Sequence, residues 1–168
     1  MNQRNFTRFQ LLFLLFPALL FLACNMESSG FSKNANTGML TTYKNLEVSG
    51  TKIFMNEEEI NHVDIPLGES FIIRNENVKG LKEKDGKVSV GCSLLIQDKN
   101  GKTLLSEPDL FKGQDLFDKE QTNFLSCTVN TGSPMQWEET YDVTVVFTDK
   151  YGNGAIENKV KIRMIDVP

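Results

Sequence analysis

The sequence predicts one all-β domain, an antiparallel β-sandwich of about seven to nine strands that follows a leader and a short tether. Two observations predict it. Hydrophobic and polar residues alternate with a period of two in several segments, and turns rich in Gly, Asn and Asp separate those segments.

The composition is that of a globular protein, with 40% hydrophobic and 24% charged residues. A net charge of −4 leaves no basic surface of the kind that binds nucleic acid, so no nucleic-acid partner is expected.

The first 23 residues have the features of a secretory signal peptide. Arg4 and Arg8 form a positive start, and residues 11–23 are uncharged. A helix over this uncharged segment would span about 20 Å, which is shorter than the roughly 30 Å hydrocarbon core of a bilayer. Pro17 within it further disfavours a permanent membrane-spanning helix. We therefore expect residues 1–23 to be a leader that is removed.

The end of this leader, Phe21-Leu22-Ala23-Cys24, resembles the lipobox of bacterial lipoproteins. The resemblance implies cleavage before Cys24, acylation of Cys24 (palmitate among its acyl chains) and attachment of the protein to the membrane through that lipid. It also implies a place in the bacterial cell envelope, on the periplasmic or surface face of the outer membrane. An ordinary signal peptide followed by a chance cysteine is the alternative.

Residues 25–38 are rich in Ser, Asn and Gly and show no hydrophobic period. Such a composition is typical of a flexible linker. We therefore expect Cys24 and the residues up to 38 to form a tether, and the folded domain to occupy residues 39–168.

The body of the chain contains three strongly alternating segments, residues 87–97, 140–149 and 158–166. In the second of them Val143 and Val145 share one face and Thr144 lies on the other. This period is the signature of a strand with one buried face. The weaker strand candidates are residues 46–48, 52–55, 70–74, 104–105 and 123–129, and residues 109–120 are the only candidate for a short helical turn.

Turn sequences separate these strands. An Asn-Gly pair within residues 98–102 predicts one hairpin, and residues 84–86 and 150–154 carry similar signals. Residues 139–153 resemble the penultimate hairpin of immunoglobulin-like and PKD-like domains, and residues 66–71 resemble a turn that opens an early strand there. The resemblance implies an Ig-like sandwich in which Tyr141 bonds back to the main chain as a corner tyrosine. It carries no function.

Two cysteines remain after Cys24, namely Cys92 and Cys127, and each lies on the apolar phase of its strand. In an exported protein such a pair is a candidate for one disulfide. The alternative is a pair of buried thiols that act as small hydrophobic residues.

Catalytic and metal chemistry have little support in the sequence. His62 is the single histidine, in a polar stretch, so a Ser-His or Cys-His nucleophile has few candidates. The acidic run at residues 57–59 is most simply a solvated loop, and residues 98–102 lack the spaced acids of a calcium loop. No catalytic residue, metal site or cofactor is therefore predicted.

One long connection, residues 106–124, carries hydrophobic residues among acidic residues and glycines. If Phe111 and Phe117 lie beside Trp137 at the surface, the three form an aromatic binding patch. The alternative is that the connection folds back over one open end of the core.

Together these features predict a non-catalytic envelope lipoprotein that binds or assembles with an envelope protein or a surface polysaccharide. Two alternatives stay open: an envelope glycan hydrolase, which needs an acid pair in a cleft, and a structural spacer without a ligand.

Overall fold

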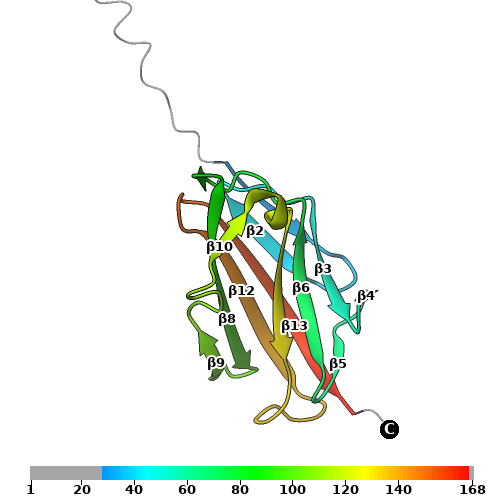
Figure 1. Ribbon diagram of the computed structural model, residues 1–168. Coiled ribbons are helices and arrows are strands. Elements are labelled where there is room, and N and C mark those ends of the chain that lie inside the picture. Colours follow the sequence, from blue (N-terminus) through cyan, green and yellow to red (C-terminus); the bar gives the residue numbers. More distant parts are fainter. Residues whose placement is uncertain (1–27, 167–168) are drawn as a thin grey trace, which may run out of the picture.

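The computed structural model describes residues 28–166, which form two β-sheets packed face to face (Figure 1). Both sheets and the hydrophobic core lie inside this segment, so we expect it to fold by itself. Its strands are β1 (Ser29–Lys33), β2 (Leu40–Lys44), β3 (Gly50–Met55), β4 (Glu58–Ile60), β5 (Asp64–Pro66), β6 (Ser70–Glu76), β7 (Glu83–Lys84), β8 (Lys87–Asp98), β9 (Thr103–Glu107), β10 (Leu116–Asp118), β11 (Phe124–Asn130), β12 (Thr140–Asp149) and β13 (Ala155–Ile165), and a 3₁₀ turn, η2 (Lys119–Thr122), precedes β11.

The larger sheet has the strand order β1-β2-β13-β12-β8-β10, with β5, β7 and β9 added at its margins, and the smaller sheet has the order β11-β6-β3-β4. Within the described residues the strand pairs are antiparallel except for β5 with β13. The predicted all-β sandwich is therefore confirmed. The strand count exceeds the prediction because β4, β5, β7 and β10 have only two or three residues, too few to show alternation.

The predicted alternation places the core between the sheets. In β12 the side chains of Val143, Val145 and Phe147 are fully buried, and the residues between them face outward. The same pattern holds along β13 and the second half of β8, whereas Ser89 and Gly91 in the first half of β8 are buried as well. Burial of the hydrophobic side chains is the main force that holds the layers together. The weak strand candidate at residues 46–48 is wrong: it forms an isolated bridge at Glu47 and lies outside the strands.

The start of the sandwich also differs from the prediction. Residues 29–33, which were expected to belong to the tether, form β1 and pair with β2 along its whole length. The ring of Tyr43 lies over Gly30, and a Cβ at that glycine would come within 2.5 Å of the ring. Pairing with β2 and cover by Tyr43 thus make a strand from a segment with little strand propensity of its own.

The sandwich has two distinct ends (Figure 1). At one end the carbonyl of Ser28 accepts a hydrogen bond from the N–H of Asn45, whose side chain contacts the β12–β13 turn at Asn153. At the other end lie the β8–β9 turn, the β11–β12 loop and the last residues of β13. There the hydroxyl of Tyr141 accepts a hydrogen bond from the N–H of Gln136 at 2.8 Å, as expected for a corner tyrosine.

A buried polar network ties the two sheets together. The side chain of Asn158 on β13 exchanges hydrogen bonds with Asn75 on β6, each 2.9 Å long, and accepts hydrogen bonds from Thr41 and Thr51. All four side chains are buried. A satisfied network in an apolar core fixes the relative position of the sheets, since sliding them would leave polar groups unpaired.

Candidate functional site

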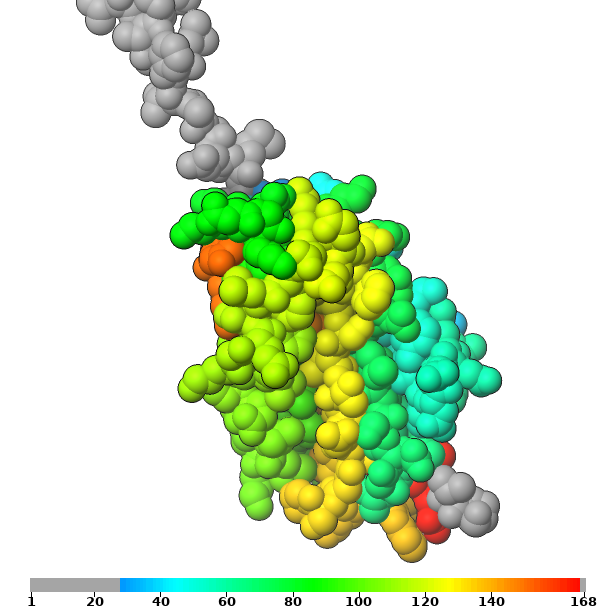
Figure 2. Space-filling model, viewed as in Figure 1, coloured from blue at the N-terminus to red at the C-terminus, as the bar shows by residue number. Residues whose placement is uncertain are grey.

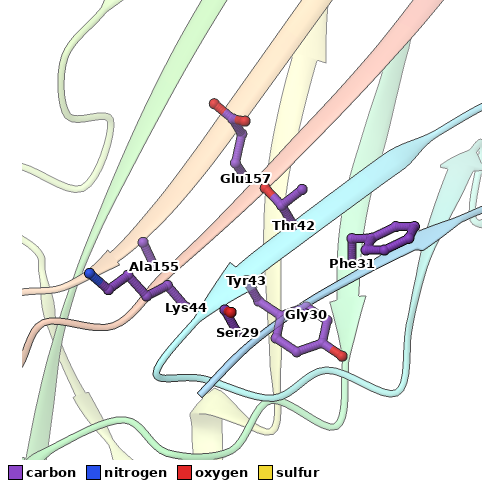
Figure 3. A pocket seen from close by; sticks show the side chains of 8 residues that line it. All are labelled: Ser29, Gly30, Phe31, Thr42, Tyr43, Lys44, Ala155 and Glu157. Carbon is purple, nitrogen blue, oxygen red and sulfur yellow. The ribbon is translucent and has the colours of Figure 1, made fainter. Parts of the chain in front are cut away.

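The outer face of the larger sheet is hollowed by two neighbouring depressions. The first, of about 410 Å³, lies over β1, β2 and the start of β13 (Figure 3). Phe31 and Thr42 are paired across β1 and β2, and Thr42 is paired with Glu157 on β13, so these three side chains stand in one row. Phe31 is 75% exposed and lines the depression together with Tyr43 and Ala155.

The second depression, of about 550 Å³, continues along the same face toward the far end of the sheet. Strand register places Lys159 of β13 between Leu40 of β2 and Thr144 of β12. The next outward row holds Asp142 and Gln97, which are paired across β12 and β8. Successive outward residues of a strand are about 7 Å apart, so the two depressions form one shallow surface.

Most charges on this face are already paired. Lys159 contacts Glu157 at 2.8 Å, and Lys161 contacts Asp142 at 3.0 Å. At the end of β13, Arg163 donates to Asp64 at 2.8 Å, and this hydrogen bond lowers the pKa of the Asp64 carboxyl. The face is therefore polar without a strong charge of either sign, and it is rich in groups that hydrogen-bond neutral hydroxyls.

The three aromatic residues predicted to form a patch do not come together. Phe111 and Phe117 are half-buried against the core, with their ring centroids 5.6 Å apart, and Phe111 also contacts Phe147. Trp137 is 58% exposed, but it lies in the β11–β12 loop just before β12 begins, whereas Phe147 lies near the other end of β12. Phe147 is seven residue steps along β12 from Thr140, a distance of roughly 23 Å. The alternative reading of residues 106–124, a cover over the core, is the one that the structure supports.

Electrostatic contacts hold that cover in place. The ammonium of Lys150 contacts Asp109 at 2.7 Å and Asp115 at 2.6 Å. A carboxylate oxygen of Asp109 also accepts the backbone N–H groups of Cys92 and Phe111. The Lys150 hydrogen bonds are the main reason that the pKa values of both aspartates are lowered. These charged groups serve to position the connection.

Cys92 and Cys127 meet between the two sheets as buried free thiols. A hydrogen bond to Cys127, together with burial, raises the pKa of the Cys92 thiol. Cys127 also contacts the carbonyl of Thr128 at 3.8 Å. Cys92 and Cys127 are therefore neighbours, as the sequence predicts, and a disulfide between them stays a prediction.

The remaining candidate catalytic or metal-binding side chains are either isolated from one another or already hydrogen-bonded to neighbouring groups. His62 is exposed in the turn before β5. Asp98 and Glu139 line one pocket of about 360 Å³ near the far end, but Asp98 accepts the N–H groups of its own turn and Glu139 pairs with Lys99. Across residues 28–166, no group of three or more His, Cys, Asp or Glu side chains is arranged to hold a metal ion. In the same residues, no helix has the length and apolar character needed to cross a membrane.

The outer face of the smaller sheet presents a second feature that sequence reasoning missed. The guanidinium of Arg74 stacks on the ring of Phe54, with its central carbon 3.8 Å from the ring centroid, and lies 5.4 Å from the centroid of Phe124. These residues come from β6, β3 and β11. The available signal was an arginine at an outward position of an alternating strand, flanked by strands with outward phenylalanines.

Comparisons with known proteins concern the fold alone. No protein-family profile matches the chain, and no curated protein sequence matches it. Among solved structures, the crystal structure of the C-terminal domain of Wzt superposes with a TM-score of 0.52 and 7% sequence identity, over 86% of this chain and 81% of that one. The likeness agrees with the two-layered all-β architecture seen here.

Proposed function

We propose that this protein is a non-catalytic, glycan-binding module of a lipid-anchored protein of the bacterial cell envelope. The observation that carries the glycan part is the pair of joined depressions on the outer face of the larger sheet. Their lining combines an exposed aromatic ring, Phe31, with the hydroxyl and amide groups of Thr42, Thr144 and Gln97. Sugars present hydroxyl groups and apolar ring faces together, and this lining is complementary to both.

The shape of the surface supports a chain-like ligand. Sites for small molecules are concave and enclose most of the ligand's surface. Here both depressions are shallow and open, and they follow one another across β1, β2, β13 and β12. A polysaccharide lying across the strands would contact both at once, so several weak contacts would add up along one ligand.

A hydrolase is less well supported than a binding module. Each depression is lined by one carboxylate, Glu157 in the first and Asp142 in the second, and each of these is paired with a lysine. Glycoside hydrolysis requires two carboxyl groups on either side of the scissile bond, with one held protonated. The arrangement therefore favours recognition without cleavage.

Binding can be tested with residues 28–168 and purified envelope polysaccharides, namely O-chain polysaccharide and peptidoglycan, by isothermal titration calorimetry. Phe31→Ala should weaken binding about fivefold to tenfold, because an aromatic contact contributes roughly 1 kcal/mol. Gln97→Ala should weaken it as well. Thr128→Ala, an exposed substitution on the smaller sheet, is the matched control. Equal affinity in all four proteins, or no binding by the unmodified chain, would refute the proposal.

The anchoring part rests on the lipobox-like sequence that ends at Cys24, which lies outside the described residues. It can be tested by expressing the full chain in a Gram-negative host and separating membrane and soluble fractions. The unmodified chain should enter the membrane fraction with a mass increased by its acyl chains. Cys24→Ser should lose both properties, and membrane retention of that variant would rule out acylation as the anchor.

A further inference from the structure

The outer face of the smaller sheet carries a self-complementary set of charges around an apolar centre. We call this surface the Arg74 face and define it by its outward residues Lys52, Phe54, Glu59, Ile72, Arg74, Glu76, Phe124, Ser126 and Thr128. Its strands β11, β6 and β3 lie side by side on the side of the molecule shown in Figure 2. It is the face opposite to the two depressions.

Arg74 is the unusual residue of this face. Its guanidinium is held between Phe54 and Phe124, and Phe124 is 50% exposed. The Nε atom of Arg74 is buried and has no hydrogen-bond partner in residues 28–166. A buried donor without an acceptor is unfavourable, more so when the group is charged. The side chain is thus held in place by stacking with its Nε atom covered, and because the side chain is 29% exposed, a partner would reach the guanidinium through its atoms beyond Nε.

The acid nearest to Arg74 is Glu76, and its geometry explains why the pair stays incomplete. The Nε atom of Arg74 is 3.6 Å from a carboxylate oxygen of Glu76, too far for a hydrogen bond. The two residues lie two positions apart on β6, so their side chains stand parallel, with Cα atoms about 7 Å apart. The other two charges of the face, Lys52 and Glu59, satisfy each other at 2.7 Å.

From this arrangement we infer that the Arg74 face is the contact surface of a symmetric dimer of this chain, in which Arg74 of each protomer donates hydrogen bonds to Glu76 of the other. In a two-fold interface each residue meets the same surface of its partner in reciprocal order. A neighbouring pair of opposite charges is complementary to its own copy under that symmetry. The dimer would also cover the side chains of Phe54, Ile72 and Phe124. It would give the guanidinium of Arg74 a planar carboxylate as hydrogen-bond acceptor.

Other occupants fit less well. An acidic partner protein would meet the carboxylate of Glu76 beside Arg74, and like charges in an interface disfavour binding. A glycan would find a flat sheet surface here, whereas the depressions lie on the opposite face. Paired charges around an apolar centre, with an arginine and phenylalanines in the middle, are typical of a protein interface.

The size of the face sets the expected strength. Three strands of six or seven residues and the three-residue β4, at about 4.8 Å spacing, cover at most about 19 by 23 Å. That footprint lies at the small end of specific protein interfaces, where complexes are weak and reversible. We therefore expect a dimer that forms as protein concentration rises through the micromolar range.

Sedimentation velocity of residues 28–168 over a concentration series tests the inference. The unmodified chain should shift from monomer to dimer, and Arg74→Glu and Glu76→Arg should each keep it monomeric. The double variant Arg74→Glu/Glu76→Arg should regain the dimer, because exchange of the two charges restores complementarity. Lys161→Glu, on the opposite face, should dimerise like the unmodified chain.

A monomer for the unmodified chain at all concentrations up to about 1 mM overturns the inference. So does loss of the dimer in Arg74→Glu with no recovery in the double variant, because that result points to an acidic surface elsewhere as the partner of Arg74. Circular dichroism checks that each variant is folded. Phe124→Lys, an exposed substitution, serves as a second disrupting variant if Arg74→Glu unfolds the sheet, and it should also leave the chain monomeric.

Discussion

Truncation of Asn158 should be among the most destabilising single changes in this protein. Asn158→Ala removes two hydrogen bonds with Asn75 and the acceptor of the Thr41 and Thr51 hydroxyls. Thr41 keeps its 2.7 Å hydrogen bond to Thr51, and Asn75 keeps its own to Thr51. The amide oxygen of Asn75 and one of its N–H groups are left buried without a partner.

The magnitude follows from those orphaned groups. Each buried polar group without a partner costs about 1–3 kcal/mol. The space left by the side chain, roughly 40 Å³, adds about 1 kcal/mol at the cost measured for core cavities. We therefore expect the free energy of unfolding to fall by about 3–7 kcal/mol, a large part of the 5–15 kcal/mol that a domain of this size has.

Urea unfolding followed by circular dichroism measures the effect in residues 28–168. The matched control is Asn61→Ala, in the exposed turn before β5, for which a change within about 0.5 kcal/mol is expected. The double variant Asn75→Ala/Asn158→Ala should cost much less than the sum of its two single variants, because each change removes the group that the other orphans. Additive effects, or a loss below about 1 kcal/mol for Asn158→Ala, would refute the account of the network.

Three further predictions concern the core, the cover and the first strand. If Cys92 and Cys127 form the predicted disulfide, reductant should lower the free energy of unfolding by about 3–4 kcal/mol and raise the intact mass by two hydrogens; an unchanged mass leaves them as thiols. Lys150→Met should flatten the pH dependence of stability below about pH 4, because Lys150 stabilises the charged forms of two aspartates whose pKa values are lowered in the folded protein. This stabilisation is present above the pKa of the aspartates in the unfolded chain and is lost as pH falls through their pKa in the folded protein. Equal acid unfolding curves for the two proteins would contradict this. Gly30→Ala should destabilise the domain by about 1–3 kcal/mol through a clash with the facing tyrosine ring, whereas Gly50→Ala, with open space around its Cβ position, should have little effect on the urea midpoint.

The interior of the fold could be predicted from the sequence because alternation reports it directly. The strands β8, β12 and β13 are long, and each has one face that packs continuously into the core, so their hydrophobic period is unbroken. The first strand was missed for the opposite reason. It contains one large hydrophobic residue, Phe31, whose side chain faces outward, and it owes its conformation to β2 and Tyr43.

The candidate surfaces were less predictable because they depend on strand order. Phe111 and Phe117 contact each other, but Phe111 also contacts Phe147, and the register of β10 against β8 places Phe117 opposite Val88, so both rings pack against the core. Arg74 meets Phe54 and Phe124 because β6 lies between β3 and β11, an order that local sequence does not encode. Sequence patterns report which way a side chain points, whereas tertiary topology decides what stands next to it.

If Cys24 is acylated as proposed, the early start of β1 limits how far the sandwich can stand from the bilayer. Five residue steps separate Cys24 from Ser29, and a fully extended chain covers about 17 Å in that number. A protein acylated at Cys24 would thus sit with its β12–β13 turn close to the headgroups and with Trp137 at its outer tip, roughly the 35 Å length of β13 away. The depression beside Phe31 would then lie within reach of the sugars nearest the membrane, such as the inner units of a membrane-anchored polysaccharide.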